Sequence, residues 1–131
     1  MAVTFFCPFC GKATTDEEKT CSRCGNSIER WREFPFEERL LLTLRHPIVE
    51  YRMMAIQLLG QRRYARAVPI FTEMISTERD VYILREIAFA LARIGTPESR
   101  RVLEQLNAHK SPVVRCAIEE IQSASGEGDP A

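Results

Sequence analysis

The sequence predicts a small all-α protein in which helical hairpins stack into a short α-solenoid behind a cysteine-rich N-terminal module. Two observations support this fold class: apolar residues recur every three or four positions through most of the chain, and parts of this pattern repeat about one hairpin later. No strand-like alternation competes with it. We therefore expect a cysteine module at residues 1–30, an aromatic linker at 31–35, helical repeats at 36–123 and a disordered tail at 124–131.

Composition and charge narrow the classes of function. The chain has 131 residues, of which 45% are hydrophobic, and its formal net charge at pH 7 is zero. A balanced charge argues against a general binder of nucleic acids or membrane surfaces. No run approaches the roughly 18 apolar residues that cross a bilayer, and the first residues do not resemble a signal peptide. We therefore expect a cytoplasmic protein that does not associate with membranes.

Prolines and glycines divide the helical segment. We expect a first helix at residues 36–45 and a second that begins at Pro47, because proline disfavours the helical conformation of the residue before it and suits the first position of a helix. Glycine commonly follows the last residue of a helix, so the second helix should stop at Gly60. The third should cover residues 67–75.

Proline and glycine also mark the boundaries of the remaining three helices. The fourth should stop at Gly95. Thr96 and Ser111 each precede a proline. Their side chains can cap a helix, and the proline suits its first turn, so the fifth and sixth helices should begin at these two sites. The sixth helix should cover residues 112–122. Each helix has one apolar stripe, and we expect these stripes to form the core. They include Leu40, Leu44, Tyr51, Ala55, Leu59, Val68, Phe71, Leu84, Ile87, Leu91, Val102, Leu106, Val114 and Ile118.

Two stretches of the helical segment occur again further along the chain. The stretch from Arg52 to Gly60 is similar to the one that starts at Arg85, 33 positions later, and the stretch that starts at Ala67 is similar to the one at Ser99, 32 positions later. A truncated third copy starts at Pro112. Such a period is typical of helical solenoids, in which each hairpin buries its apolar face against its neighbours.

With these elements, the chain resembles short HEAT repeats of the type found in phycobilin-lyase-like proteins. The resemblance rests on Pro-x-Val, Arg-x-x-Ala, Leu-Gly, Ala-Val-Pro and Arg-Ile-Gly-x-Pro-Glu elements between His46 and Ile121. It implies a right-handed stack of helical hairpins whose surfaces bind other proteins. The name of the lyase group does not transfer lyase chemistry to this chain.

The strongest chemical signal is a cysteine motif that occurs twice, as Cys7-Pro-Phe-Cys10-Gly and Cys21-Ser-Arg-Cys24-Gly. Two cysteines three positions apart on a tight turn direct both sulfurs to one point, and the glycine that follows permits a positive φ angle. Four sulfurs predict a closed tetrahedral site, for which zinc is the favoured ion and iron the less favoured one. A disulfide framework would need an oxidising compartment, and a thioredoxin-like redox pair would need a βαβ context.

Residues 5–28 are similar to the short zinc ribbons found at the ends of many bacterial and archaeal proteins. A module of this length is shorter than the roughly 40 residues at which a hydrophobic core alone usually suffices. We therefore expect the metal to contribute the folding free energy of the module and to have no catalytic role.

Arginine is the main cation of the chain, since of 18 basic residues only Lys12, Lys19 and Lys110 are lysine. Six arginines flank two turns that a solenoid places on the same edge. We take these as candidate partner-binding residues: Arg62, Arg63, Arg66, Arg93, Arg100 and Arg101. Guanidinium groups bind carboxylates and phosphates through paired hydrogen bonds. The alternative is that they are solvated surface residues or pair with nearby glutamates.

Three further features are less specific. Cys116 lies on the last helical stripe, and we expect a small core or interface thiol there rather than a reactive thiol or a fifth metal ligand. His46 and His109 have no carboxylate or cysteine at metal or triad spacing, so we expect surface or capping roles.

Trp31 and the aromatic residues after it should pack on the first helices, so that the cysteine module caps the open end of the solenoid. The alternative is a module that tumbles independently.

These observations together predict a non-catalytic, zinc-binding adaptor or scaffold that recognises a protein partner and has neither catalytic nor organic cofactor-binding residues. A nucleic-acid-associated or ribosome-associated zinc-ribbon protein is the first alternative. A bilin-lyase-like chaperone for a tetrapyrrole or its acceptor protein is the second. The oligomeric state stays open, because one side of the last helix has no following helix to cover it.

Overall fold

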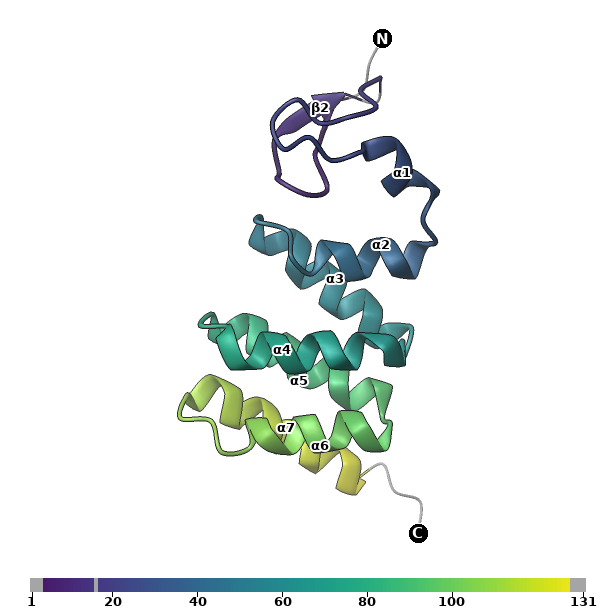
Figure 1. The fold of residues 1–131 in the computed structure, drawn as a ribbon. Helices are drawn as coiled ribbons and strands as arrows, with labels where there is room; N and C mark the ends of the chain where they lie inside the picture. The colour runs from purple at the N-terminus through teal and green to yellow at the C-terminus, as the bar shows by residue number, and fades with distance from the viewer. Residues whose placement is uncertain (1–3, 16, 128–131) are drawn as a thin grey trace. The chain divides into compact units, whose positions relative to one another are not determined.

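The computed structural model describes residues 4–15 and 17–127 and confirms the all-α, solenoid-like fold class (Figure 1). The chain divides into two compact units, residues 1–55 and residues 56–131, with the boundary inside one helix. Among the described residues, no helix combines the length and hydrophobicity that a membrane crossing requires. Each unit is described separately below.

The first unit begins with a small sheet. Strands β1 (Thr4–Phe6) and β2 (Ala13–Thr15) pair antiparallel, with Thr4 opposite Thr15 and Phe6 opposite Ala13. Helices α1 (Ile28–Glu33) and α2 (Phe36–Thr43) follow, and then the first half of α3 (Val49–Gln61). The sheet carries the first pair of cysteines on the connection between its strands.

Helix α1 differs from the sequence analysis, which placed an aromatic linker at residues 31–35. Residues 31–33 form the last half of this helix instead. It begins because the Ser27 side chain accepts a hydrogen bond from the backbone N–H of Arg30, at 3.1 Å, which is an ordinary N-cap. It ends before Pro35, where the chain becomes extended at Phe34. The sequence signal was present at Ser27, but a six-residue helix is too short to show a periodic apolar stripe.

The start of α3 also differs from the expectation that Pro47 occupies its first position. The helix begins at Val49, and Ile48 contributes the first helical carbonyl, which accepts hydrogen bonds from Tyr51 and Arg52. The ring nitrogen Nδ1 of His46 accepts the backbone N–H of Ile48 at 3.1 Å. This histidine therefore caps the helix, and the proline holds the turn between the cap and the helix.

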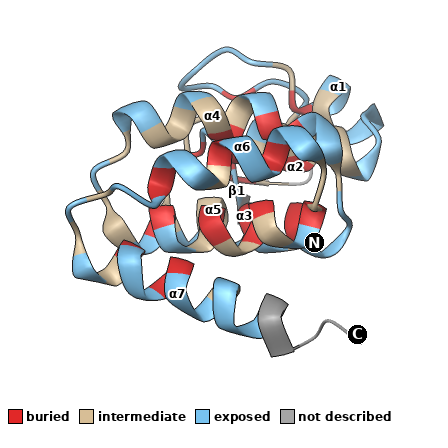
Figure 2. Ribbon diagram, turned by 90° about the horizontal axis from the view of Figure 1, so that it is seen from below, coloured by how far each residue is buried: buried red, intermediate tan, exposed pale blue. Residues whose placement is uncertain are grey.

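The second unit consists of consecutive helical hairpins. After the second half of α3 come a short 3₁₀ turn (Ala65–Ala67) and helices α4 (Val68–Thr77), α5 (Val81–Ile94), α6 (Pro97–Leu106) and α7 (Pro112–Glu127). Figure 2 shows α4 and α6 in one layer and α5 and α7 in the other, and these pairs are in contact. This is the stacking of successive hairpins that the sequence repeats predict.

The predicted caps of α5 and α6 are confirmed. Gly95 ends α5 in the left-handed conformation at φ 68°, and Thr96 caps α6 by accepting the N–H of Ser99 at 3.1 Å, with Pro97 in the first turn. The Asp80 side chain caps α5 by accepting the N–H groups of Tyr82 and Ile83.

Gly60 does not end α3, as the sequence analysis expected, because the helix continues to Gln61. The left-handed residue after this helix is Arg63, at φ 51°. Gly60 allows α3 to approach α5 instead: a Cβ atom at this position would lie 2.8 Å from the Cα atom of Ala90 and 2.9 Å from its Cβ atom. The glycine is therefore a packing requirement.

The core of the second unit contains most of the predicted apolar stripes, together with Ile56 and Ile83, which the sequence analysis did not place on a stripe. Its largest fully buried side chains include Ile56, Leu59, Val68, Phe71, Ile83, Leu84, Ile87, Leu91 and Val114. At the end of the chain, α7 runs to Glu127, four residues beyond the expected boundary at residue 123. No proline interrupts the chain before Pro130, so the backbone of these residues can continue the helix. The rest of the expected disordered tail, residues 128–131, lies outside the described residues.

Candidate metal centre and arginine edge

The two cysteine motifs form turns with the same backbone hydrogen bonds. In the first, Cys7 N–H donates to the Lys12 carbonyl at 2.7 Å and Gly11 N–H donates to the Cys7 carbonyl at 3.0 Å. In the second, Cys21 N–H donates to the Asn26 carbonyl at 3.0 Å and Gly25 N–H donates to the Cys21 carbonyl at 2.9 Å. Both glycines have positive φ angles, 81° and 78°, as expected. Each motif is therefore a self-contained knuckle that directs its sulfurs inward.

The two knuckles bring four sulfurs together. The Sγ atoms of Cys7 and Cys24 are 3.8 Å apart, those of Cys10 and Cys21 are 3.6 Å apart, and all four lie within 4.8 Å of one another. A tetrahedral site with metal–sulfur bonds of about 2.3 Å has sulfur–sulfur edges of about 3.8 Å. The four cysteines therefore fit the ligand set of a single ion.

The four sulfurs are only partly shielded from solvent. Cys7 and Cys21 are buried against Ile28, with Phe9 and Cys10 packed around them, whereas Cys24 is exposed. This buried cluster is small, so apolar burial alone gives the module little stability. The Lys12 side chain donates to the hydroxyl of Ser22, which ties the first knuckle to the second.

The sulfurs differ in electrostatic environment. Burial raises the pKa of the Cys7 thiol to about 12. In the second knuckle, hydrogen bonds from backbone N–H groups act in the opposite direction: that of Cys24 is the main reason that the pKa of Cys21 falls to about 6, and that of Asn26 lowers the pKa of Cys24. The second knuckle thus favours thiolate by itself, whereas the buried Cys7 thiol needs a nearby cation to ionise.

His46 supports the first knuckle, a role that the sequence analysis missed when it expected a surface or capping residue. Its ring is 1% exposed, and Nε2 lies 2.9 Å from the Cys7 carbonyl oxygen while Nδ1 caps α3. Because Nδ1 accepts an N–H, the proton of the neutral ring is on Nε2, which donates to the carbonyl. One side chain therefore connects the knuckle to the start of α3. Its spacing of 39 residues from Cys7 gives no local sequence signal.

An aromatic cavity lies beside this histidine within the first unit. It has a volume of about 190 Å³ and is lined in part by Phe6, Trp31, Tyr51 and Met54. The Phe6 and Tyr51 rings are 6.2 Å apart, and both Phe6 and Met54 are about half exposed. The aromatic residues near the expected linker are thus only partly covered, and the Arg39 guanidinium lies over the ring of Trp31 at 5.3 Å.

The second unit contains the six candidate arginines, and all six are exposed. Arg62, Arg63 and Arg66 belong to the turn between α3 and α4, whereas Arg93, Arg100 and Arg101 flank the turn between α5 and α6. Figure 1 shows the two turns at the same edge of this unit. We call these six residues the arginine edge.

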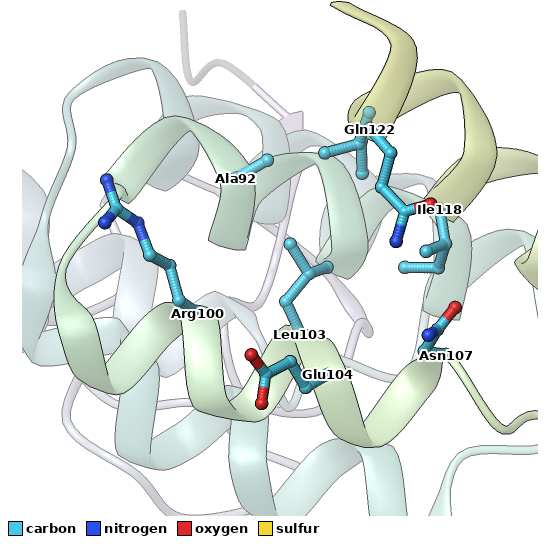
Figure 3. Close-up of a pocket in the computed structure, with 8 residues that line it drawn as sticks. Ala92, Arg100, Leu103, Glu104, Asn107, Ile118 and Gln122 are labelled. Atoms are coloured by element: carbon cyan, nitrogen blue, oxygen red, sulfur yellow. The ribbon is translucent and has the colours of Figure 1, made fainter. Parts of the chain in front are cut away.

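The last hairpin forms a groove next to this edge. Figure 3 shows Leu103 and Ile118 on facing helices, with Arg100 and Glu104 at one rim of a cavity of about 290 Å³. Cys116 lies elsewhere on α7 and is exposed, so the expectation of a core thiol is wrong and the interface role stays a prediction. The reason is its place on the helix: the neighbours Ala117 and Ile118 take the buried positions of the stripe.

Comparisons with known proteins give one match. A family model described as HEAT repeats matches residues 37–122. The comparisons with curated proteins and with solved structures found no match to this chain. The matched segment starts within α2 and ends within α7, so it contains the hairpins described above.

Proposed function

Because this chain belongs to the HEAT-repeat family, we propose that it is a non-catalytic adaptor, in which a zinc-loaded cysteine module precedes, along the chain, a short helical-repeat segment that binds a protein partner. The family match carries this proposal, since HEAT repeats commonly mediate protein interactions. A stack of hairpins offers side chains of successive turns at regular intervals, which suits the recognition of an extended partner.

In this proposal Cys7, Cys10, Cys21 and Cys24 are the ligands of one structural zinc ion. Zinc supplies the positive charge that allows four thiolates to pack together, and it needs no redox change. The chain contributes the rest: the backbone N–H groups of Phe9, Cys24 and Asn26 act on the sulfurs of Cys7, Cys21 and Cys24, and His46 holds the first knuckle at the start of α3. Four tetrahedrally placed sulfurs leave no position for a substrate, which argues for a structural site.

The proposed location is the cytoplasm. A reducing compartment keeps cysteines as thiols and thereby available to a metal ion. We also propose that the cysteine module ends at residue 30 and that the repeats cover residues 36–123. In this proposal the repeats bind the partner.

Metal analysis tests the first half of the proposal. The protein is produced with equal zinc and iron in the medium, and both metals are measured by mass spectrometry together with protein concentration. One zinc per chain is expected, and a matched variant with Cys116→Ser should keep it. One iron per chain, or no metal in a folded chain, would contradict the assignment.

Affinity purification from the native cell tests the second half. A tagged chain and a variant with serine at the four knuckle cysteines are compared by mass spectrometry of the proteins that they retain. A defined protein retained by the intact chain is expected. Retention of RNA instead, with steep loss at high salt, would support the nucleic-acid alternative.

A further inference from the structure

The arginine edge combines turns whose backbones are held in place. After α3, Arg63 N–H donates to the Gly60 carbonyl at 3.0 Å and Tyr64 N–H donates to the Leu59 carbonyl at 3.1 Å. The Arg66 guanidinium donates to the Tyr64 hydroxyl at 3.3 Å. After α5, the left-handed Gly95 and the cap at Thr96 hold the second turn. The backbone positions that carry these arginines are therefore fixed.

Charge is distributed unevenly over the two edges of this unit. Six arginines occupy one edge. Glu98 lies in the first turn of α6, Glu104 lines the groove together with Arg100, and Glu86 and Glu120 line a hollow together with Arg93. At the turn between α4 and α5, Asp80 is engaged as a helix cap and Glu78 accepts the N–H of Asp80 at 3.1 Å. A chain with zero net charge thus has one edge at which arginines outnumber the acidic residues near them.

The spacing of the turns indicates the shape of a ligand. Neighbouring packed helices are separated by about 8–10 Å, and the close approach of Gly60 to Ala90 shows that α3 and α5 pack tightly. A polyproline II segment advances about 3.1 Å per residue with three residues per turn, so every third side chain lies on one face at intervals of about 9 Å. Acidic side chains at that interval would meet both arginine-bearing turns.

We propose that the arginine edge binds an extended acidic segment of a protein partner, with carboxylates at every third position. The inference rests on the proposed function as a protein-binding module and names the chemistry of its partner. Arginine rather than lysine favours carboxylates held by paired hydrogen bonds. The zero net charge of the chain favours a short acidic peptide over a long polyphosphate, whose phosphates beyond the edge would gain no attraction from the rest of the surface.

A peptide-binding assay tests this proposal on the full chain. The probe is a fluorescein-labelled peptide of four Glu-Pro-Ala repeats, and binding is measured by fluorescence anisotropy at low and high salt. The control probes are the same peptide with glutamine for glutamate, a peptide of equal composition with consecutive glutamates, and a labelled single-stranded RNA. Binding should be strongest for the first peptide and absent for the glutamine peptide.

Matched triple variants locate the binding surface. The edge variant is Arg63→Asn, Arg100→Gln and Arg101→Gln, in which asparagine tolerates the left-handed conformation at position 63. The control variant removes three exposed arginines outside the edge: Arg79→Gln, Arg85→Gln and Arg115→Gln. The edge variant should weaken binding about tenfold or more, as expected for the loss of several charge-assisted hydrogen bonds, and the control should change it by less than about twofold.

Each result decides for or against the edge. Equal weakening by both variants would mean attraction by total charge and would overturn the proposal, as would tighter binding of the RNA than of the peptide. Thermal melting of each variant separates lost binding from lost folding. If a protein partner is retained from cells but the acidic peptide is not bound, the acidic-segment inference fails while the adaptor function stands.

Discussion

Alanine at position 60 should destabilise the second unit, although alanine is the better helix former. Gly60 is inside α3, where a glycine costs about 1 kcal/mol relative to alanine. The added methyl group, however, would lie 2.8 Å from the Cα atom of Ala90 and 2.9 Å from its Cβ atom. Neither of these atoms can rotate away, so α3 and α5 would have to separate.

The two effects can be compared in magnitude. Overpacking of a tight contact costs about 1–3 kcal/mol, and a clash with backbone belongs near the upper end of that range. Subtracting the propensity gain leaves a net loss of about 1–2 kcal/mol. For a domain of this size, 1 kcal/mol corresponds to about 4 °C in Tm, so the expected fall for Gly60→Ala is about 4–8 °C.

Thermal denaturation followed by the helical circular dichroism signal measures this change. Gln61→Ala is the matched control, because Gln61 is the next residue of the same helix and is exposed. It should stay within about 0.5 kcal/mol of the parent chain. A Gly60→Ala variant as stable as the parent, or more stable, would refute the packing argument and leave only the helix propensity of glycine.

Four further outcomes follow from the structure. His46→Ala should destabilise the chain by about 2–3 kcal/mol in chemical denaturation because one buried and one partly buried hydrogen bond are lost, whereas His109→Ala, which removes a single partly buried bond from the N–H of Ser111, should cost about 0.5–1 kcal/mol. Cys21→Ser should abolish stoichiometric metal in elemental analysis, and a variant that retains full occupancy would exclude Cys21 as a ligand. Bound metal should be released as the pH falls, because protons compete for the thiolates, and a chromogenic chelator would follow this release; release that rises with pH would contradict thiolate ligation. Thr96→Ala should lower stability by about 1 kcal/mol in urea denaturation through loss of the α6 cap, and no change would show that the cap is dispensable.

Much of the fold could be predicted from the sequence because its signals are local. The helix ends at Gly95 and Thr96 depend on a left-handed glycine and a side-chain cap, and both act within a few residues. The two cysteine knuckles are local in the same sense: each is closed by hydrogen bonds within one six-residue segment. Patterns of this kind can be read without knowing the tertiary arrangement.

The features that were missed depend on contacts between distant segments. Gly60 resembles a helix stop in the sequence, and only its approach to Ala90 gives the reason for a glycine. His46 resembles a surface residue, and its burial depends on Cys7, 39 positions earlier. Cys116 lies beside buried stripe residues, and its exposure depends on the rotation of α7 against its neighbours. A residue type alone does not determine such environments.

The position of Trp31 allows changes in the first unit to be followed by tryptophan fluorescence. It is the single tryptophan of the chain, and it lines the cavity that also contacts Pro8, the residue next to the first sulfur, and His46. Its indole fluorescence responds to the polarity around the ring, so loosening of the first knuckle would change the emission without any attached dye. Unlabelled protein can therefore report the state of its own cysteine module, and the helices of the second unit contribute no tryptophan background.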